Sequence, residues 1–185
     1  MALEDKQKWN KKYRNNPIPD TPIKLVTEFA GLAPGKQALD IACGMGRHSK
    51  YLASLGFEVD ALDVSSLAIR SLRNIPYIHA KEVDFDTYIL PKEHYDLIVC
   101  TFFLQRELFP QIIEALKPGG ILIYETFVYH PDNEQVPSKR SYLLEEGELE
   151  NAFKEAMELI ESREYWHNPT DGIKMKKASL VAKKL

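Results

Sequence analysis

The chain has 185 residues, a formal net charge of −3 and 44% apolar residues, a balance that predicts one globular domain over residues 1–185. It lacks a run of about 18 apolar residues and an apolar leader, so we expect neither a membrane span nor a secretory signal, and a cytoplasmic location. The negative charge argues against a nucleic-acid partner. The two cysteines and five histidines do not follow a metal-ligand spacing, so we expect no metal.

Residues 1–16 form a charged segment in which Trp9 and Tyr13 lie four positions apart, on one face of a predicted helix. Two interpretations remain open: a stripe that packs on the domain, or a lid that closes over a ligand. Basic residues gather in this segment and again at residues 174–184. We interpret both groups as solvated, one on a helix face and one on the edge of a sheet.

Short apolar runs recur along the chain and are nearly continuous, which is typical of strands buried on both faces of a parallel sheet. They predict strands at residues 37–42, 58–64, 95–100 and 121–126, with a weaker strand at 77–80. Helices are predicted between them at residues 46–55, 65–74 and 106–116, the last before a Lys-Pro-Gly-Gly stop. This alternation implies a doubly wound sheet with right-handed crossovers.

The last part of the chain follows a different pattern. After a predicted loop at residues 128–142 comes a predicted helix at 145–156, and then two extended stretches at 157–166 and 173–183. The turn formers at residues 168–172 join these stretches into an antiparallel hairpin. We therefore expect a doubly wound, Rossmann-like α/β domain with a mostly parallel seven-stranded sheet that ends in an antiparallel hairpin.

A glycine-bearing turn follows the first predicted strand, at Gly44 and Gly46, and the acidic Asp63 ends the next strand. Glycine lets a ligand approach the backbone closely, and a carboxylate in the place of Asp63 can accept hydrogen bonds from ribose hydroxyls. A dinucleotide site favours a third glycine where this chain has Ser49. Asp40, four residues before the first glycine, suits a ligand with positive charge near the turn.

The segment LDIACGMGR around this turn resembles motif I of the class I methyltransferases, which use S-adenosylmethionine. Further similarity follows in order: VDFDTYIL, YDLIVCTFFL and LKPGGILIYETF resemble later motifs of the same class. The N-terminal Trp9, Tyr13 and Arg14, together with YLLEEGELENAF, are similar to the small tellurite-resistance (TehB-like) and thiopurine-type methyltransferases. The resemblance implies binding of S-adenosylmethionine, release of S-adenosylhomocysteine and methyl transfer to a small molecule.

The resemblance also implies roles for particular residues. The glycine turn would face the methionine part of the donor, with Asp40 supporting its ammonium directly or through water and Asp63 on its ribose. Asp84 and Phe85 would flank the adenine, Tyr13 would lie near the sulfonium, and Arg14 on the donor carboxylate. The expected donor-binding residues are Tyr13, Arg14, Asp40, Ala42, Gly44, Gly46, Asp63, Val64, Asp84, Phe85, Thr101 and Phe102.

Methyl transfer needs a general base only when the acceptor must lose a proton. Glu125, His130 and His167 are the candidates, and Arg47 either contacts an anionic acceptor or lies on a helix surface. The related enzymes carry a His-Arg pair in the final hairpin, where this chain keeps only His167, which argues against an oxyanion acceptor. Two alternatives remain: a donor-binding protein without turnover, and an NAD-dependent oxidoreductase. The acceptor, its nucleophilic atom and the oligomeric state stay open.

Overall fold

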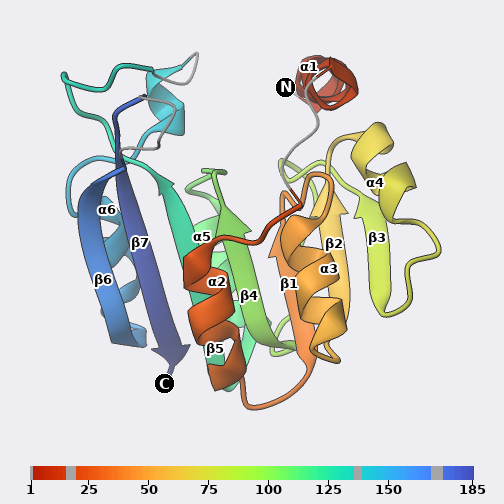
Figure 1. The fold of residues 1–185 in the computed structure, drawn as a ribbon. Coiled ribbons are helices and arrows are strands. Elements are labelled where there is room, and N and C mark those ends of the chain that lie inside the picture. Colours follow the sequence, from red (N-terminus) through yellow and green to blue (C-terminus); the bar gives the residue numbers. More distant parts are fainter. Residues whose placement is uncertain (1, 16–19, 136–138, 168–172) are drawn as a thin grey trace.

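A computed structural model describes residues 2–15, 20–135, 139–167 and 173–185, and it contains one seven-stranded sheet between two layers of helices (Figure 1). The strands are β1 (Gln37–Ile41), β2 (Glu58–Asp63), β3 (Ile78–Glu82), β4 (Tyr95–Thr101), β5 (Leu116–Phe127), β6 (Met157–His167) and β7 (Met175–Lys184). The helices are α1 (Ala2–Asn15), α2 (Lys24–Phe29), α3 (Arg47–Ser54), α4 (Ser66–Leu72), α5 (Leu108–Ala115) and α6 (Glu148–Phe153), with 3-10 turns η1 (Ala30–Leu32) and η2 (Arg140–Tyr142).

The strand order is β3-β2-β1-β4-β5-β7-β6. The first five strands of this order are parallel, while β7 runs antiparallel to both β5 and β6. This confirms the predicted fold class. The chain winds outward from β1 to β3 and then returns to add β4 on the other side of β1. In such a sheet, ligands bind in the crevice beyond the carboxyl ends of the strands at this reversal.

Both faces of the central strands are buried, which explains their nearly continuous apolar sequences. On one face Leu52 and Phe57 pack with Val59, Leu97 and the apolar side of α2, and α3 and α4 cover the rest. On the other face α5 and α6 pack on a larger cluster that includes a ring group of Phe109, Tyr124 and Phe153. Figure 1 shows α2 and α3 in front of the sheet and α5 and α6 behind it.

Three local departures from the predicted elements have clear causes. Helix α2, which was not predicted, is short, and it buries Leu25 and Val26 against the sheet. Strand β5 begins at Leu116, ahead of the predicted start, because Leu116 already pairs with Tyr95 of β4. The register between the two strands then shifts before Leu97 pairs with Ile121, and Gly119 in this irregular part takes a positive φ of 79°. Helix α6 begins later than predicted, since Gly147 precedes it with φ 72°.

The interpretation of the C-terminal basic residues as a solvated sheet edge is wrong. Strand β7 lies between β5 and β6, so it is an interior strand. Lys177 is buried and its Nζ lies 3.4 Å from Glu125 Oε1, while Lys176 pairs with Glu164 at 2.9 Å. The sheet pairing therefore places a cation inside the protein, where the sequence pattern indicated a surface.

Among the helices that the structure describes, none has the length and apolar character needed to cross a membrane. The predicted hairpin turn at residues 168–172 lies outside the described ranges. The two cysteines, Cys43 and Cys100, are both buried, and neither forms a disulfide.

Candidate functional site

The turn after β1 has an unusual backbone. Ala42, Gly44 and Gly46 all take positive φ angles, of 53°, 54° and 76°. A side chain at Gly46 would lie 2.4 Å from Leu72 of α4, so this glycine is needed for packing between the turn and that helix. Gly44 instead lines a cavity at the carboxyl edge of the sheet. The two glycines of the motif therefore have different duties.

Asp63 at the end of β2 holds this turn in place. Its Oδ2 accepts the backbone N–H of Gly44 at 2.9 Å and its Oδ1 accepts that of Ser65 at 2.8 Å. The side chain is 4% exposed and faces the same cavity. Burial raises the pKa of Asp63, and the backbone N–H groups oppose that rise by stabilising the charged form. Each carboxylate oxygen keeps a lone pair for a ligand.

Asp40 lies beneath the turn and not in the cavity wall. It is 1% exposed, and its Oδ2 accepts a hydrogen bond of 2.6 Å from the hydroxyl of Ser49 on α3. Burial raises the pKa of Asp40 to about 7, although the bond from Ser49 lowers it. The structure thus does not bring this carboxylate to the position expected for direct contact with a donor ammonium, because its side chain is directed into the packing between β1 and α3.

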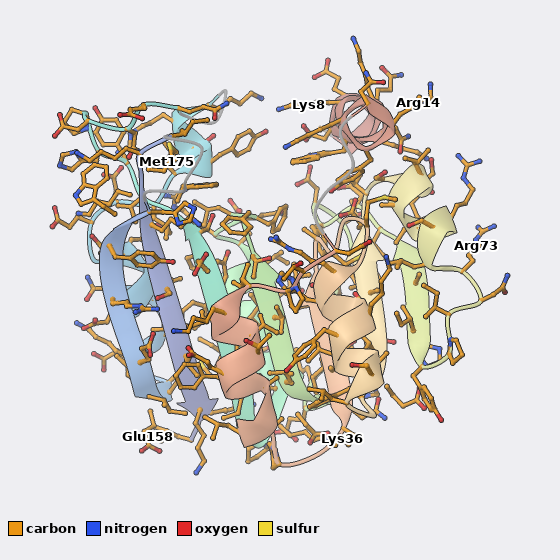
Figure 2. All side chains as sticks on the ribbon, in the orientation of Figure 1. Lys8, Arg14, Lys36, Arg73, Glu158 and Met175 are labelled. Carbon is orange, nitrogen blue, oxygen red and sulfur yellow. The ribbon has the colours of Figure 1, made fainter. Side chains whose placement is uncertain are left out.

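The cavity has a volume of about 880 Å³, at the upper end of the range for sites that enclose small ligands. Its wall joins α1, the turn after β1, the ends of β2 and β4, the segment after β3 and the start of β7. Ten of the predicted site residues line it: Tyr13, Ala42, Gly44, Asp63, Val64, Asp84, Phe85, Thr101, Phe102 and His167. Figure 2 shows Lys8 and Met175, which also line it, on opposite sides of the space above the sheet.

Five predicted site residues do not line this cavity: Arg14, Asp40, Gly46, Glu125 and His130. Arg14 is exposed on the outer side of α1, because its neighbour Tyr13 occupies the inner side (Figure 2). Nδ1 of His130 accepts the backbone N–H of Asp132 at 3.1 Å, and its ring meets Trp166 edge-on at 4.8 Å. Among the three general-base candidates, only His167 lies in the wall.

Helix α1 lies across the carboxyl end of the sheet beside α4 (Figure 1). Asn10 fastens it, because its Oδ1 accepts the hydroxyl of Ser65 at 2.6 Å and the N–H of Leu67 at 3.1 Å. Trp9 and Tyr13 stack with ring centroids 5.5 Å apart, and Tyr13 is only 7% exposed. The aromatic pair therefore packs on the domain and at the same time forms part of the cavity wall.

Phe102, directly after β4, also lines the cavity. It is a non-glycine residue with φ 56°, held there by a 2.8 Å hydrogen bond from its N–H to the carbonyl of Glu125. The guanidinium of Arg47 lies 5.3 Å and the Nζ of Lys177 lies 4.6 Å from its ring centroid. Backbone strain of this kind gathers at functional sites, where surrounding contacts hold it in place.

Sequence reasoning did not identify Lys177 or His48 as residues of this cavity, although both line it. His48 accepts the N–H of Ile23 at 3.3 Å, and burial lowers its pKa to about 3, so the ring is neutral. For Lys177 one signal was available: alternation along the predicted strand puts it on the same face as Met175 and Ser179, which are both buried. No comparable signal pointed to His48.

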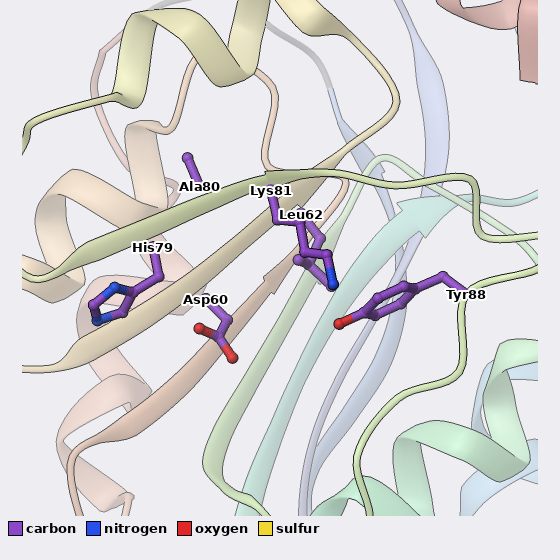
Figure 3. A pocket seen from close by; sticks show the side chains of 6 residues that line it. All are labelled: Asp60, Leu62, His79, Ala80, Lys81 and Tyr88. Carbon is purple, nitrogen blue, oxygen red and sulfur yellow. The ribbon is translucent and has the colours of Figure 1, made fainter.

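A second, smaller depression of about 440 Å³ lies at the edge strand β3 (Figure 3). Asp60 in its floor accepts the hydroxyl of Tyr95 at 2.7 Å, and Lys81 lies over the ring of Tyr88 at 4.6 Å. Asp60 and Lys81 thus already have partners within the protein, and none of the predicted site residues lines this depression. In the ranges that the structure describes, no group of three or more His, Cys, Asp and Glu side chains could hold a metal ion.

Comparison with known proteins adds to this geometry. A family model described as tellurite resistance protein TehB matches residues 1–179. A probable S-adenosyl-L-methionine-dependent methyltransferase TehB from Haemophilus influenzae is 30% identical over 177 residues, which cover 86% of this chain and 61% of the relative. This chain therefore spans about three fifths of that relative's length. A ubiquinone biosynthesis O-methyltransferase from Burkholderia multivorans is 31% identical, and the match covers 64% of this chain and 56% of that relative's length.

Solved structures agree. The crystal structure of TehB from Haemophilus influenzae has a TM-score of 0.74 at 28% identity and covers 97% of this chain and 67% of its own. The [4+2]-cyclase SpnF has a TM-score of 0.76 at 16% identity over 100% of this chain and 97% of its own, so it shows a shared fold alone. With nearly its whole length matched by the family model, this chain belongs to the tellurite resistance protein TehB family and has the Rossmann-like fold of S-adenosylmethionine-dependent methyltransferases.

Proposed function

We propose that this protein is a class I methyltransferase that moves the methyl group of S-adenosylmethionine to a small-molecule acceptor. The observation that carries the proposal is the place of Asp63, which holds the Gly44 turn by one hydrogen bond and faces the cavity with its remaining lone pairs. Family membership and the S-adenosylmethionine-dependent relatives support the choice of donor.

The residues in the wall fit this donor. Asp63 offers carboxylate lone pairs to the two ribose hydroxyls, and Asp84 and Phe85, which line the same cavity, are proposed to flank the adenine. Ala42 and Gly44 present a turn without a bulky side chain to the methionine part. The stacked ring of Tyr13 offers an electron-rich face, which suits a sulfonium. Asp40 acts from beneath the turn, where its charge reaches a donor ammonium only through the intervening layer.

S-adenosylmethionine supplies an activated methyl group on a sulfonium, so the protein has to align the acceptor with it and exclude water. Holding the two in line removes much of the barrier. Helix α1, fastened by Asn10, closes one side of the cavity, and we propose that it acts as a lid as well as a packing element. His167 is the remaining candidate for a base where an acceptor must lose a proton, because Glu125 and His130 do not line the cavity.

Two other functions compete with methyl transfer. A donor-binding protein without methyl transfer is compatible with the fold, since the fold is shared by a protein described as a [4+2]-cyclase and not as a methyltransferase. An NAD-dependent oxidoreductase is disfavoured, because Ser49 stands at the third glycine position and its hydroxyl bonds the buried Asp40 just under the turn. A carboxylate there opposes the pyrophosphate of a dinucleotide and favours a cationic ligand.

The experiment has two parts. Titration calorimetry with S-adenosylhomocysteine should show one site per chain, and a homocysteine-release assay should show turnover on members of a panel of oxyanions, tellurite included, thiols, phenols and small metabolites. Absence of heat with S-adenosylhomocysteine, together with binding of NADH, would overturn the proposal. Donor binding without turnover on any acceptor would instead favour the first alternative.

A further inference from the structure

Arg47 begins α3 directly after the glycine turn, and its half-buried side chain lines the cavity. Its guanidinium lies over the Phe102 ring, 5.3 Å from the centroid. Asp40 and Glu125 attract it electrostatically, but among the described residues neither forms a hydrogen bond or a close ion pair with it. A guanidinium carries five N–H donors, and leaving them unused in a partly desolvated wall is costly. A guanidinium in this wall is suited to bind an anionic ligand.

Lys177 approaches the same ring from β7. It is 6% exposed, and its Nζ lies 4.6 Å from the Phe102 centroid and 5.7 Å from that of Phe127. Glu125 holds the ammonium at 3.4 Å, while its other oxygen accepts the hydroxyl of Tyr165 at 2.8 Å. Glu125 is thus a positioning residue, and Lys177 has further N–H donors that the bond to Glu125 does not use.

Two cations meet at the ring of Phe102. Arg47 and Lys177 supply two cations, and Glu125 is the one carboxylate paired with either of them in the described ranges. Asp40 also attracts Arg47 from beneath the turn, but burial raises the pKa of Asp40 to about 7, so it carries only part of a negative charge near neutral pH. Burial lowers the pKa of Lys177 and the charge of Arg47 lowers it further, which agrees with two like charges held close together. An anion bound between them relieves this repulsion.

We propose that Arg47 and Lys177 bind the carboxylate of the methyl acceptor, and that this acceptor is a small organic acid whose apolar body packs on Phe102, Phe103, Phe127 and Met175. The inference rests on the function proposed above. It names the substrate class of the same cavity and gives Lys177 a role in specificity.

The surroundings of the two cations favour an organic acid over other anions. The rings of Phe102 and Phe127 and the side chain of Met175 line the cavity beside them. A small inorganic oxyanion there would lose hydration to aromatic faces that offer no hydrogen bonds. A neutral acceptor would cover the guanidinium of Arg47 and leave it without a partner. An acid with an apolar body pairs its carboxylate with the two cations and packs its body on the apolar side chains.

The position of Lys177 separates this site from the donor carboxylate. The donor is expected along β1, β2 and β4, whereas Lys177 comes from β7, beyond β5. Arg47 stands nearer the glycine turn, so its variant decides whether it serves the donor or the acceptor.

The test measures binding, so it does not depend on finding the natural acceptor. Calorimetry on the full chain saturated with S-adenosylhomocysteine would compare 3-mercaptobenzoate, 4-hydroxybenzoate and phenylacetate with their methyl esters and with inorganic phosphate and tellurite. The acids should bind at least tenfold more tightly than the esters and the inorganic anions. Arg47→Gln should weaken the acids by about tenfold to 100-fold, the range for a lost charged hydrogen bond, and leave S-adenosylhomocysteine within threefold.

The second cation needs a variant that keeps the buried charges balanced. Lys177→Met combined with Glu125→Gln removes both members of the pair, retains an acceptor for Tyr165, and should weaken the acids as Arg47→Gln does. Lys183→Met, an exposed lysine of the same strand, is the control and should change nothing.

Three results would overturn the inference. Equal binding of acids and esters removes the need for a cationic site, and tighter binding of phosphate or tellurite than of any organic acid contradicts the substrate class. A loss of S-adenosylhomocysteine affinity above tenfold in Arg47→Gln assigns that residue to the donor. Failure of the wild-type protein to bind S-adenosylhomocysteine contradicts the proposed function instead, so the two failures are distinguishable.

Discussion

Replacing Asp63 by asparagine separates its two duties, since the side chain both holds the glycine turn and faces the cavity. In the wild type one oxygen accepts the N–H of Gly44 and the other that of Ser65. An asparagine keeps the shape but puts an amide NH₂ against one of these donors. That loses one hydrogen bond and leaves a buried N–H unsatisfied, at a cost of about 1–3 kcal/mol.

A second effect opposes this cost. Burial raises the pKa of Asp63, so its charge is unfavourable in the unliganded protein, and asparagine removes that charge. We therefore expect a net change in the free energy of unfolding of about 1 kcal/mol, which for a domain of this size shifts Tm by under about 4 °C. Binding has no such compensation. Hydrogen bonds to a charged acceptor contribute about 1.5–3 kcal/mol each, so weakening two bonds should lower the affinity for S-adenosylhomocysteine about 100-fold.

The assay is titration calorimetry of wild type and Asp63→Asn, with thermal melts of both. Asp60→Asn is the matched control, because Asp60 lies on the same strand, outside the large cavity, and asparagine still accepts the hydroxyl of Tyr95. Its affinity should stay within threefold of wild type. If Asp63→Asn also binds within threefold of wild type while melting normally, the ribose role of this carboxylate is refuted.

Further predictions concern titration and closure. Because burial raises the pKa of Asp40 to about 7, above an unfolded value near 4, the folded state holds more protons and the free energy of unfolding should fall as pH rises from about 4 to 7. Asp40→Asn should remove this fall, by up to about 1.4 kcal/mol per pH unit in urea titrations, and an unchanged slope would count against it. Burial lowers the pKa of His48 to about 3, so its contribution has the opposite sign: stability should be lost as pH drops below about 6.5, and His48→Gln should reduce that loss in acid denaturation. An identical acid midpoint would exclude this effect. Asn10→Ala should loosen α1 and weaken S-adenosylhomocysteine about tenfold with a Tm change under about 4 °C, whereas the exposed Lys11→Ala should do neither; normal binding in Asn10→Ala would contradict the lid.

The sequence was sufficient for the fold and for the donor side of the cavity because both depend on short-range patterns. Apolar runs predict strands wherever both faces are buried. The glycine turn and Asp63 follow two strands that are consecutive in the chain, and such strands are commonly neighbours in this kind of sheet. The predicted strand at residues 58–64 and the observed β2 differ by a single residue at one end. These features need no knowledge of which distant segments meet.

The acceptor side depends on long-range pairing, which the sequence does not display. Lys177 is buried only because β7 is inserted between β5 and β6, which pairs it with Phe127 on one side and Tyr165 on the other. Asn10 meets the first turn of α4 across more than fifty positions of sequence. The position of Asp40 in the motif predicts support of the donor ammonium, directly or through water, and only the packing of α3 shows that Ser49 hydrogen-bonds its side chain.

The aromatic stack on α1 gives the protein an optical reporter. Of its two tryptophans, Trp9 stacks on Tyr13 in the cavity wall with the Lys12 ammonium 4.4 Å from its ring, whereas Trp166 lies against His130. Indole emission depends on such neighbours, so any displacement of α1 changes the signal from Trp9. A Trp166→Phe variant keeps that one emitter, and ligand binding and helix closure can then be followed in real time without an attached dye.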